Sequence, residues 1–223
     1  MLQQSTLNFL KSLSKNNTRE WFEKNRKAYE AAKEDMIALT EAVIIQLGKK
    51  DLTIAGLTAK NCIYRINRDI RFSKDKSPYK KHMAASLIRD GKKSNFGGYY
   101  IHIEPGNKSI IGGGKYQTDP EMIRKIRQEI DYNWDEFRKI IKNKKFISVY
   151  GDIDKSPEFS LSREPKGYEK DNPAIDYLKL KSWIAFTELK DTDLTSKGLV
   201  KKIADSLEAL KPLLDFLNRA IAE

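Results

Sequence analysis

The sequence predicts an α+β fold in which an antiparallel meander sheet packs against N-terminal and C-terminal helices. Two observations lead to this prediction. Apolar residues recur at helical spacing near both ends of the chain, and short alternating segments separated by turn residues occupy its middle. We expect a single domain over residues 1–223. Its expected parts are a helical segment (1–50), a sheet core (60–116), helices (119–143), a loop and strand (150–187) and C-terminal helices (195–222).

The N-terminal segment predicts two helices. Asn17 and Glu20 have the spacing of a capping box, in which a side-chain oxygen and a carboxylate three residues later satisfy free backbone N–H groups. The apolar residues that follow recur as an amphipathic stripe, so we expect a helix from Asn17 to about Leu47. A shorter helix over residues 6–13 should precede it.

The middle of the chain predicts antiparallel strands. Residues 62–66 and 83–89 are β-prone, and Asp90 and Gly91 offer a turn, because both residues adopt positive φ at little cost. Residues 99–104 alternate between an apolar and a polar face. The polar face carries Tyr100, His102 and Glu104.

A glycine run follows the next turn. Residues 105–107 turn the chain, and a strand over residues 109–111 should end before Gly112, Gly113 and Gly114. The run does not match a phosphate-binding loop, because Tyr116 stands where that motif needs serine or threonine. We expect the glycines to form a bulge or a tight approach at a strand end.

The C-terminal half predicts helices interrupted by one long loop. Asp119 suits a helix N-cap and Pro120 suits the first helical position. The elements expected after that helix are a helix at 134–141, an irregular loop at 151–172, a short helix at 172–180, a strand at 183–186 with Trp183 in the core, and a helix at 196–222 that Pro212 kinks or divides.

Composition limits the classes of function. The formal net charge is +11 and the pI is near 9.5, which suits an acidic partner but also serves solubility. No run reaches the length of a membrane span, and the first residues lack a secretory pattern, so we expect a cytoplasmic protein without a membrane partner. Cys62 is the only cysteine, which excludes an internal disulfide and a multi-cysteine zinc site. No motif indicates a cofactor.

The most informative segment is basic. Residues 65–93 contain ten lysines and arginines and three aspartates, so this segment carries +7 of the chain's +11. Arginine forks bind phosphate or carboxylate with two hydrogen bonds, and lysines add mobile charge. An anion site there would use Arg65, Arg68, Arg71, Lys76, Tyr79 and Lys80. Two alternatives remain open: a salt-bridge network held by Asp69 and Asp75, and a solvated basic loop.

Two further groups of residues are candidates for the site. His102 and Glu104 have a spacing that can supply an acid–base pair or hold a metal, but His82 is the only other histidine, so a metal site would need carboxylates from elsewhere. The alternative is an ordinary solvated strand face. If the site performs chemistry, Asp69, His102 and Glu104 are the acid–base candidates. The long loop adds Arg163 and Lys166 as anion-binding candidates.

These segments together resemble domain-of-unknown-function family 2461. The family's signature is RxxRDxRF followed by a lysine and a tyrosine, which here corresponds to residues 65–72 with Lys76 and Tyr79. Similar flanking pieces lie at 16–22, 98–106, 112–114, 163–168 and 181–186, so the resemblance spans nearly the whole chain. The resemblance carries no particular activity, but it implies that the signature positions serve a purpose shared by the family.

The sequence therefore favours a protein that binds a phosphate- or carboxylate-bearing small molecule in an arginine-rich pocket. The alternative is a nucleic-acid-binding module without catalysis, which the positive charge and exposed aromatic residues such as Tyr79 and Tyr100 would support. Salt separates the two, because a protein that neutralises many phosphates loses affinity steeply as salt rises. A third possibility is that the charges only hold the protein's own elements together.

Overall fold

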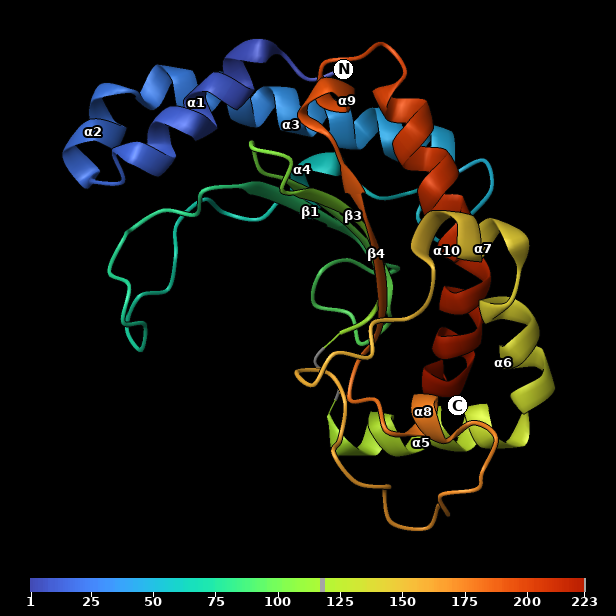
Figure 1. Ribbon diagram of the computed structural model, residues 1–223. Helices are drawn as coiled ribbons and strands as arrows, with labels where there is room; N and C mark the ends of the chain where they lie inside the picture. Colours follow the sequence, from blue (N-terminus) through green and yellow to red (C-terminus); the bar gives the residue numbers. More distant parts are fainter. Residues whose placement is uncertain (117–118, 223) are drawn as a thin grey trace.

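The computed structural model describes residues 1–116 and 119–222. Its centre is a four-stranded antiparallel sheet in the order β1-β2-β3-β4, with helices before, between and after the strands (Figure 1). The strands are β1 (Met83–Leu87), β2 (Gly98–Ile103), β3 (Ser109–Lys115) and β4 (Trp183–Leu189). The predicted α+β class and the meander order are confirmed.

The helices form three groups along the chain. The first group is α1 (Gln4–Lys15), α2 (Arg19–Lys24), α3 (Arg26–Leu47) and α4 (Ala59–Cys62). The second group is α5 (Pro120–Tyr132), α6 (Trp134–Ile141) and α7 (Lys144–Tyr150). The third group is α8 (Ile175–Leu178), α9 (Asp191–Leu194) and α10 (Leu199–Ala222). Across residues 1–116 and 119–222, none of these helices is long and apolar enough to cross a membrane.

The predicted continuous helix from Asn17 is wrong in its start and in its continuity. Thr18 is the N-cap of α2, where its hydroxyl accepts a hydrogen bond from the Trp21 backbone N–H, and Asn25 separates α2 from α3. The Asn17 amide instead forms two hydrogen bonds with the backbone of Tyr79, at 2.9 and 3.0 Å. The Asn17 side chain, which local spacing predicted as a helix cap, therefore binds a residue 62 positions away in the sequence instead.

Two predictions about the sheet need correction. Residues 62–66 do not form a strand, because Cys62 ends α4 and Ile63 joins the sheet only by a single bridge to Ala85. The glycine run lies inside β3 and pairs with both neighbouring strands, so it does not follow the strand end. The expected tight approach is present, since a Cβ on Gly113 would lie 2.1 Å from the carbonyl oxygen of Gly98.

The C-terminal half follows the prediction more closely. Asp119 caps α5 by accepting from the Met122 N–H, α6 has the expected bounds, and Trp183 is fully buried. The short α7 and α9 were not predicted, α8 is shorter than expected, and β4 runs on to Leu189. Pro212 does not divide α10, which continues through it.

The two faces of the sheet differ. One face packs against α3 and α10, which lie along the outer, convex side of the curved sheet in Figure 1. The concave side has two irregular segments beside it, residues 67–78 in teal and residues 155–172 in orange (Figure 1). We refer to residues 67–78 as the arm. The Asn67–Tyr79 bridge and the Arg68 N–H bond to the Pro78 carbonyl close its base.

Candidate functional site

The concave face of the sheet holds a cavity of about 660 Å³. This volume falls within the range of roughly 300–1,000 Å³ that small-molecule sites occupy. Its floor is hollow because Gly98 and Gly114, paired across β2 and β3, project no side chain, and Ala84 and Ser86 project small ones. Aromatic side chains form much of its wall. They are Tyr64, Phe96, Tyr99, Tyr100, Tyr116, Phe159 and Phe186.

Three lysines contribute charge to the cavity. Lys80 and Lys92 place their ammonium groups 5.4 and 5.2 Å from the ring centre of Tyr64. Lys115 is only 8% exposed, and its ammonium group donates to the Asn95 carbonyl at 2.5 Å. No aspartate or glutamate of the described chain lines the same cavity. The interior of the cavity is therefore strongly positive.

The pKa values of two of these lysines reflect that environment. Burial lowers the pKa of Lys80, and the nearby positive charges of Arg65 and Lys92 lower it further. Burial also lowers the pKa of Lys115, which the more distant Asp119 opposes. Lowered lysine pKa values show that the charged form is penalised at both positions. A bound anion would relieve that penalty.

A cluster of polar side chains lies at one edge of the cavity. The Tyr100 hydroxyl is 3.3 Å from Nδ1 of His102, and Nε2 of His102 is 3.0 Å from Oε2 of Glu104. The His82 ring stacks on the His102 ring at 4.0 Å, and Nδ1 of His82 is 3.8 Å from the same carboxylate oxygen. The side chains of His102 and Glu104 are only 14% and 23% exposed. The side chains on the polar face of β2 thus contact one another and are largely shielded from solvent.

Burial governs the protonation of this cluster. Burial lowers the pKa of His82 to about 4, and the charges of His102 and Lys80 add to the effect. Burial also lowers the pKa of His102, although its hydrogen bond to Glu104 acts in the opposite direction. Both imidazoles are therefore neutral near pH 7. Burial raises the pKa of Tyr100 to about 12, so its hydroxyl remains protonated.

We expect the folded protein to lose stability as the pH falls from 6.5 towards 4. Over this window the unfolded chain protonates His82 at its usual pKa of 6.5, whereas the folded chain resists protonation down to about 4. Urea unfolding at about pH 7 and about pH 5 measures the loss, because the interval between these two pH values lies above the usual pKa of most carboxylates. The His82→Gln variant should lose less stability over the same interval. An equal loss of stability in both proteins would show that protonation of His82 is not its cause.

The two arginines of the arm, Arg68 and Arg71, form their side-chain hydrogen bonds with other residues of the arm. Arg68 donates to Asp75 at 2.6 Å, to the Ser77 carbonyl at 3.1 Å and to the Ser73 hydroxyl at 3.2 Å. Hydrogen bonds from Ser77, followed by the one from Arg68, lower the pKa of Asp75 to about 2. These contacts bridge the two sides of the arm, so Arg68 fixes its conformation.

The remaining signature residues lie in different places. Arg71 forms two hydrogen bonds with Asp69, at 3.0 and 2.7 Å, and Lys76 donates to the Ile70 carbonyl at 3.1 Å. The expectation that Tyr79 is exposed is wrong: Tyr79 is buried and stacks on Phe22 with ring centres 3.9 Å apart, so this ring anchors the arm to the N-terminal helices.

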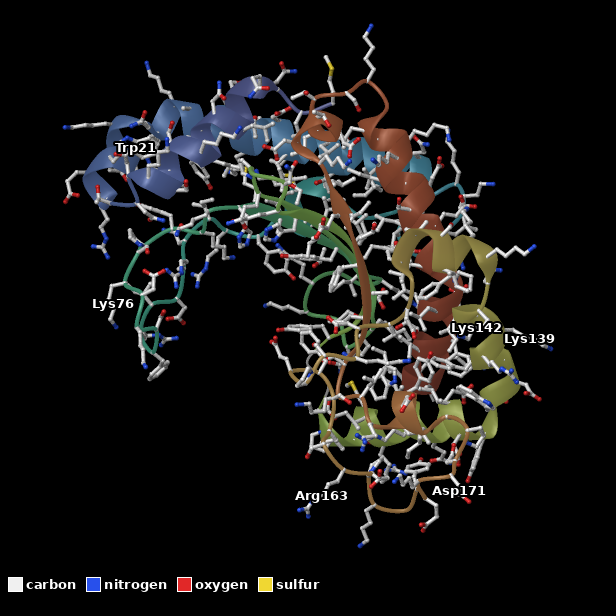
Figure 2. The ribbon with its side chains drawn as sticks, in the orientation of Figure 1. Trp21, Lys76, Lys139, Lys142, Arg163 and Asp171 are labelled. Carbon is white, nitrogen blue, oxygen red and sulfur yellow. The ribbon has the colours of Figure 1, made fainter. Side chains whose placement is uncertain are left out.

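The structure therefore brings only some of the predicted site residues together. Lys80 lines the cavity, and His102 and Glu104 contact each other beside it, while Asp69 lies on the arm and pairs with Arg71. Figure 2 shows Lys76 on the arm and Arg163 on the separate segment across the concave side. Residues predicted for the site but exposed on irregular segments are Arg65, Arg71, Lys76, Arg163 and Lys166.

Sequence reasoning missed Tyr64, Lys92 and Lys115, and did not place His82 in a site. A usable signal existed for His82. In an antiparallel pairing of residues 83–89 with 99–104, the residue before β1 falls opposite the end of β2, next to Glu104. No comparable signal marks the lysines, because they approach the cavity from three separate segments.

Replacing Arg68 with alanine should loosen the arm and leave the rest of the fold intact. Every side-chain hydrogen bond of Arg68 to a described residue lies within residues 67–78. Native-state hydrogen exchange should therefore quicken at the arm amides while protection in β2 and β3 stays unchanged. Arg163→Ala, on the other irregular segment, is the matched control and should not affect the arm. Unfolding of the sheet by Arg68→Ala would contradict a local role.

The comparisons with known proteins concern nearly the whole chain. The family model described as "Conserved hypothetical protein (DUF2461)" matches residues 5–216, a span that includes the arm, the cavity and the histidine cluster. No curated protein and no solved structure matches the chain. The membership that the resemblance predicted is therefore confirmed, and the chain belongs to the DUF2461 family of conserved hypothetical proteins.

Proposed function

We propose that this protein binds a small organic anion, a phosphate or carboxylate attached to a flat apolar group, in the cavity on the concave face of the sheet. The observation that carries the proposal is the combination of three lysines, an aromatic wall and the absence of any lining carboxylate within the described residues. Lys115 is buried and Lys80 and Lys92 are half-buried. Cations removed from water without an acidic partner are costly, and a bound anion would supply the opposite charge.

The wall and the lysines suit different parts of such a ligand. Lys80, Lys92 and Lys115 would meet the anionic group, and the rings of Tyr64 and Phe186 offer surfaces for a flat apolar group. The hollow floor over the glycines leaves room for that group. Arg65 is exposed, makes no ion pair with any residue that the structure describes, and lowers the pKa of Lys80. Arg65 therefore adds positive charge near the cavity.

A binding screen with matched probes tests the proposal. We would compare phenyl phosphate, benzoate, inorganic phosphate and benzyl alcohol by thermal shift and calorimetry, because a ligand of the folded state raises the Tm by mass action. Phenyl phosphate or benzoate should stabilise the protein more than either inorganic phosphate or the neutral alcohol does. Equal stabilisation by inorganic phosphate would show that the aromatic wall plays no part. No stabilisation by any probe would contradict the proposal.

A second candidate function rests on the arm. Phe72 is 95% exposed at a position flanked by basic residues, and the Arg71 guanidinium lies 5.8 Å from the centre of its ring. An exposed aromatic ring beside cations is typical of surfaces that stack the bases of single-stranded nucleic acid. Binding of a short oligonucleotide that weakens steeply with salt and is lost in Phe72→Ala would support this function. A small anion held in the cavity should show a much shallower dependence on salt.

A further inference from the structure

We propose that His82, His102 and Glu104 form a binding site for a divalent transition metal ion, with Zn²⁺ as the best fit, at the edge of the cavity. The three side chains can each offer one ligand atom, and these atoms all lie within 4.8 Å of one another. Two imidazoles and one carboxylate are a donor set found in zinc sites that keep a fourth position open. The three ligands are different residues from the three lysines that the proposed function relies on, although His82 lines the same cavity as those lysines.

The distances suit a tetrahedral ion. Bonds of roughly 2.0–2.1 Å in tetrahedral geometry separate neighbouring ligand atoms by roughly 3.4 Å. The Glu104 carboxylate oxygen lies 3.0 Å from Nε2 of His102 and 3.8 Å from Nδ1 of His82, which brackets that value. The stacked rings of His82 and His102 would have to turn out of their present 28° arrangement for both in-plane lone pairs to point at one ion.

The sheet itself positions the three ligands. Met83 pairs with Ile103 and Ala84 pairs with His102 in the antiparallel register of β1 and β2. Continuing that register by one residue sets His82 opposite Glu104, and His102 and Glu104 share a face because they are two residues apart. His102 thus lies within β2, while His82 and Glu104 flank the paired ends of β1 and β2, so the sheet sets the positions of all three ligands.

Neighbouring groups also favour coordination. The Tyr100 oxygen, 3.3 Å from Nδ1 of His102, can accept the ring N–H and so leave the Nε2 lone pair for an ion. The Tyr100 hydroxyl then keeps its own proton to donate into the cavity. The His82 ring makes no hydrogen bond to any residue within 1–116 or 119–222, and its nearest polar neighbour is the Glu104 carboxylate at 3.8 Å, so a ring nitrogen is available to an ion. His82 also lines the cavity, so the three ligands lie next to the space that a small molecule would enter.

The surrounding charges define which ions are expected. Imidazole with carboxylate suits Zn²⁺ and Co²⁺, whereas Mg²⁺ and Ca²⁺ prefer oxygen ligands alone. The Lys80 charge acts on His82 and opposes a cation there, while the Glu104 carboxylate offsets it. Replacing Lys80 with methionine should therefore leave metal binding intact or strengthen it.

Titration of metal-free protein with Co²⁺ tests the proposal directly. Four-coordinate Co²⁺ gives a strong visible absorption, and Zn²⁺ added afterwards should displace it. We expect one equivalent to bind to the wild type, and the affinity to fall more than about tenfold in both His82→Ala and Glu104→Gln. Cys62→Ser should bind like the wild type, since Cys62 is buried and belongs to no described ligand group.

The outcomes are distinct from those of the anion screen. Loss of Co²⁺ binding in the two ligand variants, with binding retained in Cys62→Ser and Lys80→Met, would support the metal site even if no organic anion binds. Absence of Co²⁺ and Zn²⁺ binding to the wild type would overturn it. Unchanged binding in a folded His82→Ala or Glu104→Gln protein would also overturn it. Glu104→Gln is nearly isosteric and keeps the test valid if His82→Ala fails to fold.

Discussion

Replacing Lys80 and Lys115 together with methionine should weaken the binding of phenyl phosphate by about a hundredfold or more. Each lysine can make a charge-assisted hydrogen bond to the anion, worth about 1.5 kcal/mol or more. Two such bonds amount to about 3 kcal/mol, or about a hundredfold in Kd. Isothermal titration calorimetry measures the change, and Lys108→Met, an exposed lysine in the turn after β2, is the matched control.

The same variant separates binding from stability. The lysines are partly or wholly buried and their charged forms are penalised, so methionine of similar length should cost the free protein little. The Asn95 carbonyl loses its donor from Lys115, which costs about 1 kcal/mol. Weaker binding with a nearly unchanged Tm is therefore expected. Unchanged binding in this variant, with loss of binding in an Arg68→Ala and Arg71→Ala double variant, would move the anion site to the arm.

Replacing Gly114 with alanine should destabilise the protein by more than about 4 kcal/mol or prevent it from folding. The φ angle at Gly114 is +130°, and a Cβ there would lie 2.0 Å from the Trp183 carbonyl oxygen of the neighbouring strand. Backbone strain in such a region costs about 1–3 kcal/mol, and the clash with β4 must also be relieved by separating the two strands. Urea unfolding, or the yield of soluble protein, measures the effect.

Gly198 provides the control for this substitution. A Cβ on Gly198 would meet nothing within 4 Å, so Gly198→Ala should change the free energy of unfolding by no more than about 0.5 kcal/mol. If Gly114→Ala proved as stable as Gly198→Ala, the close packing of β3 against β4 would be wrong. Close packing of the strands would then not explain why glycine occupies the cavity floor.

The sequence predicted the elements whose signals are local. The alternation in residues 99–104, the Asp119 cap and the turn at Asp90 each depend on neighbours in the chain, and all three appear as expected. The Asn17 cap failed because the amide is used by Tyr79, a distant residue that local spacing cannot reveal. Short helices such as α9 carry too few residues for a periodic signal.

The candidate site was less predictable, because charge along the chain does not reveal which charges are already paired. The density of arginine around Arg68 predicted an anion site there. In the structure, however, Arg68 pairs with Asp75 and Arg71 pairs with Asp69 within the arm. This matches the salt-bridge alternative for those residues. The cavity instead gathers Lys80 with Lys92 and Lys115, and only the pairing of β1 with β2 and of β2 with β3 brings these three lysines together.

Amide chemical-shift mapping during titration with phenyl phosphate locates the residues that contact the anion. We expect the largest shifts at Gly98 and Gly114, whose backbone forms the cavity floor, and at Lys115 beside them. The amides of residues 67–78 should move little. Large shifts confined to the arm, with the glycine signals unmoved at saturation, would contradict a binding cavity on the concave face of the sheet.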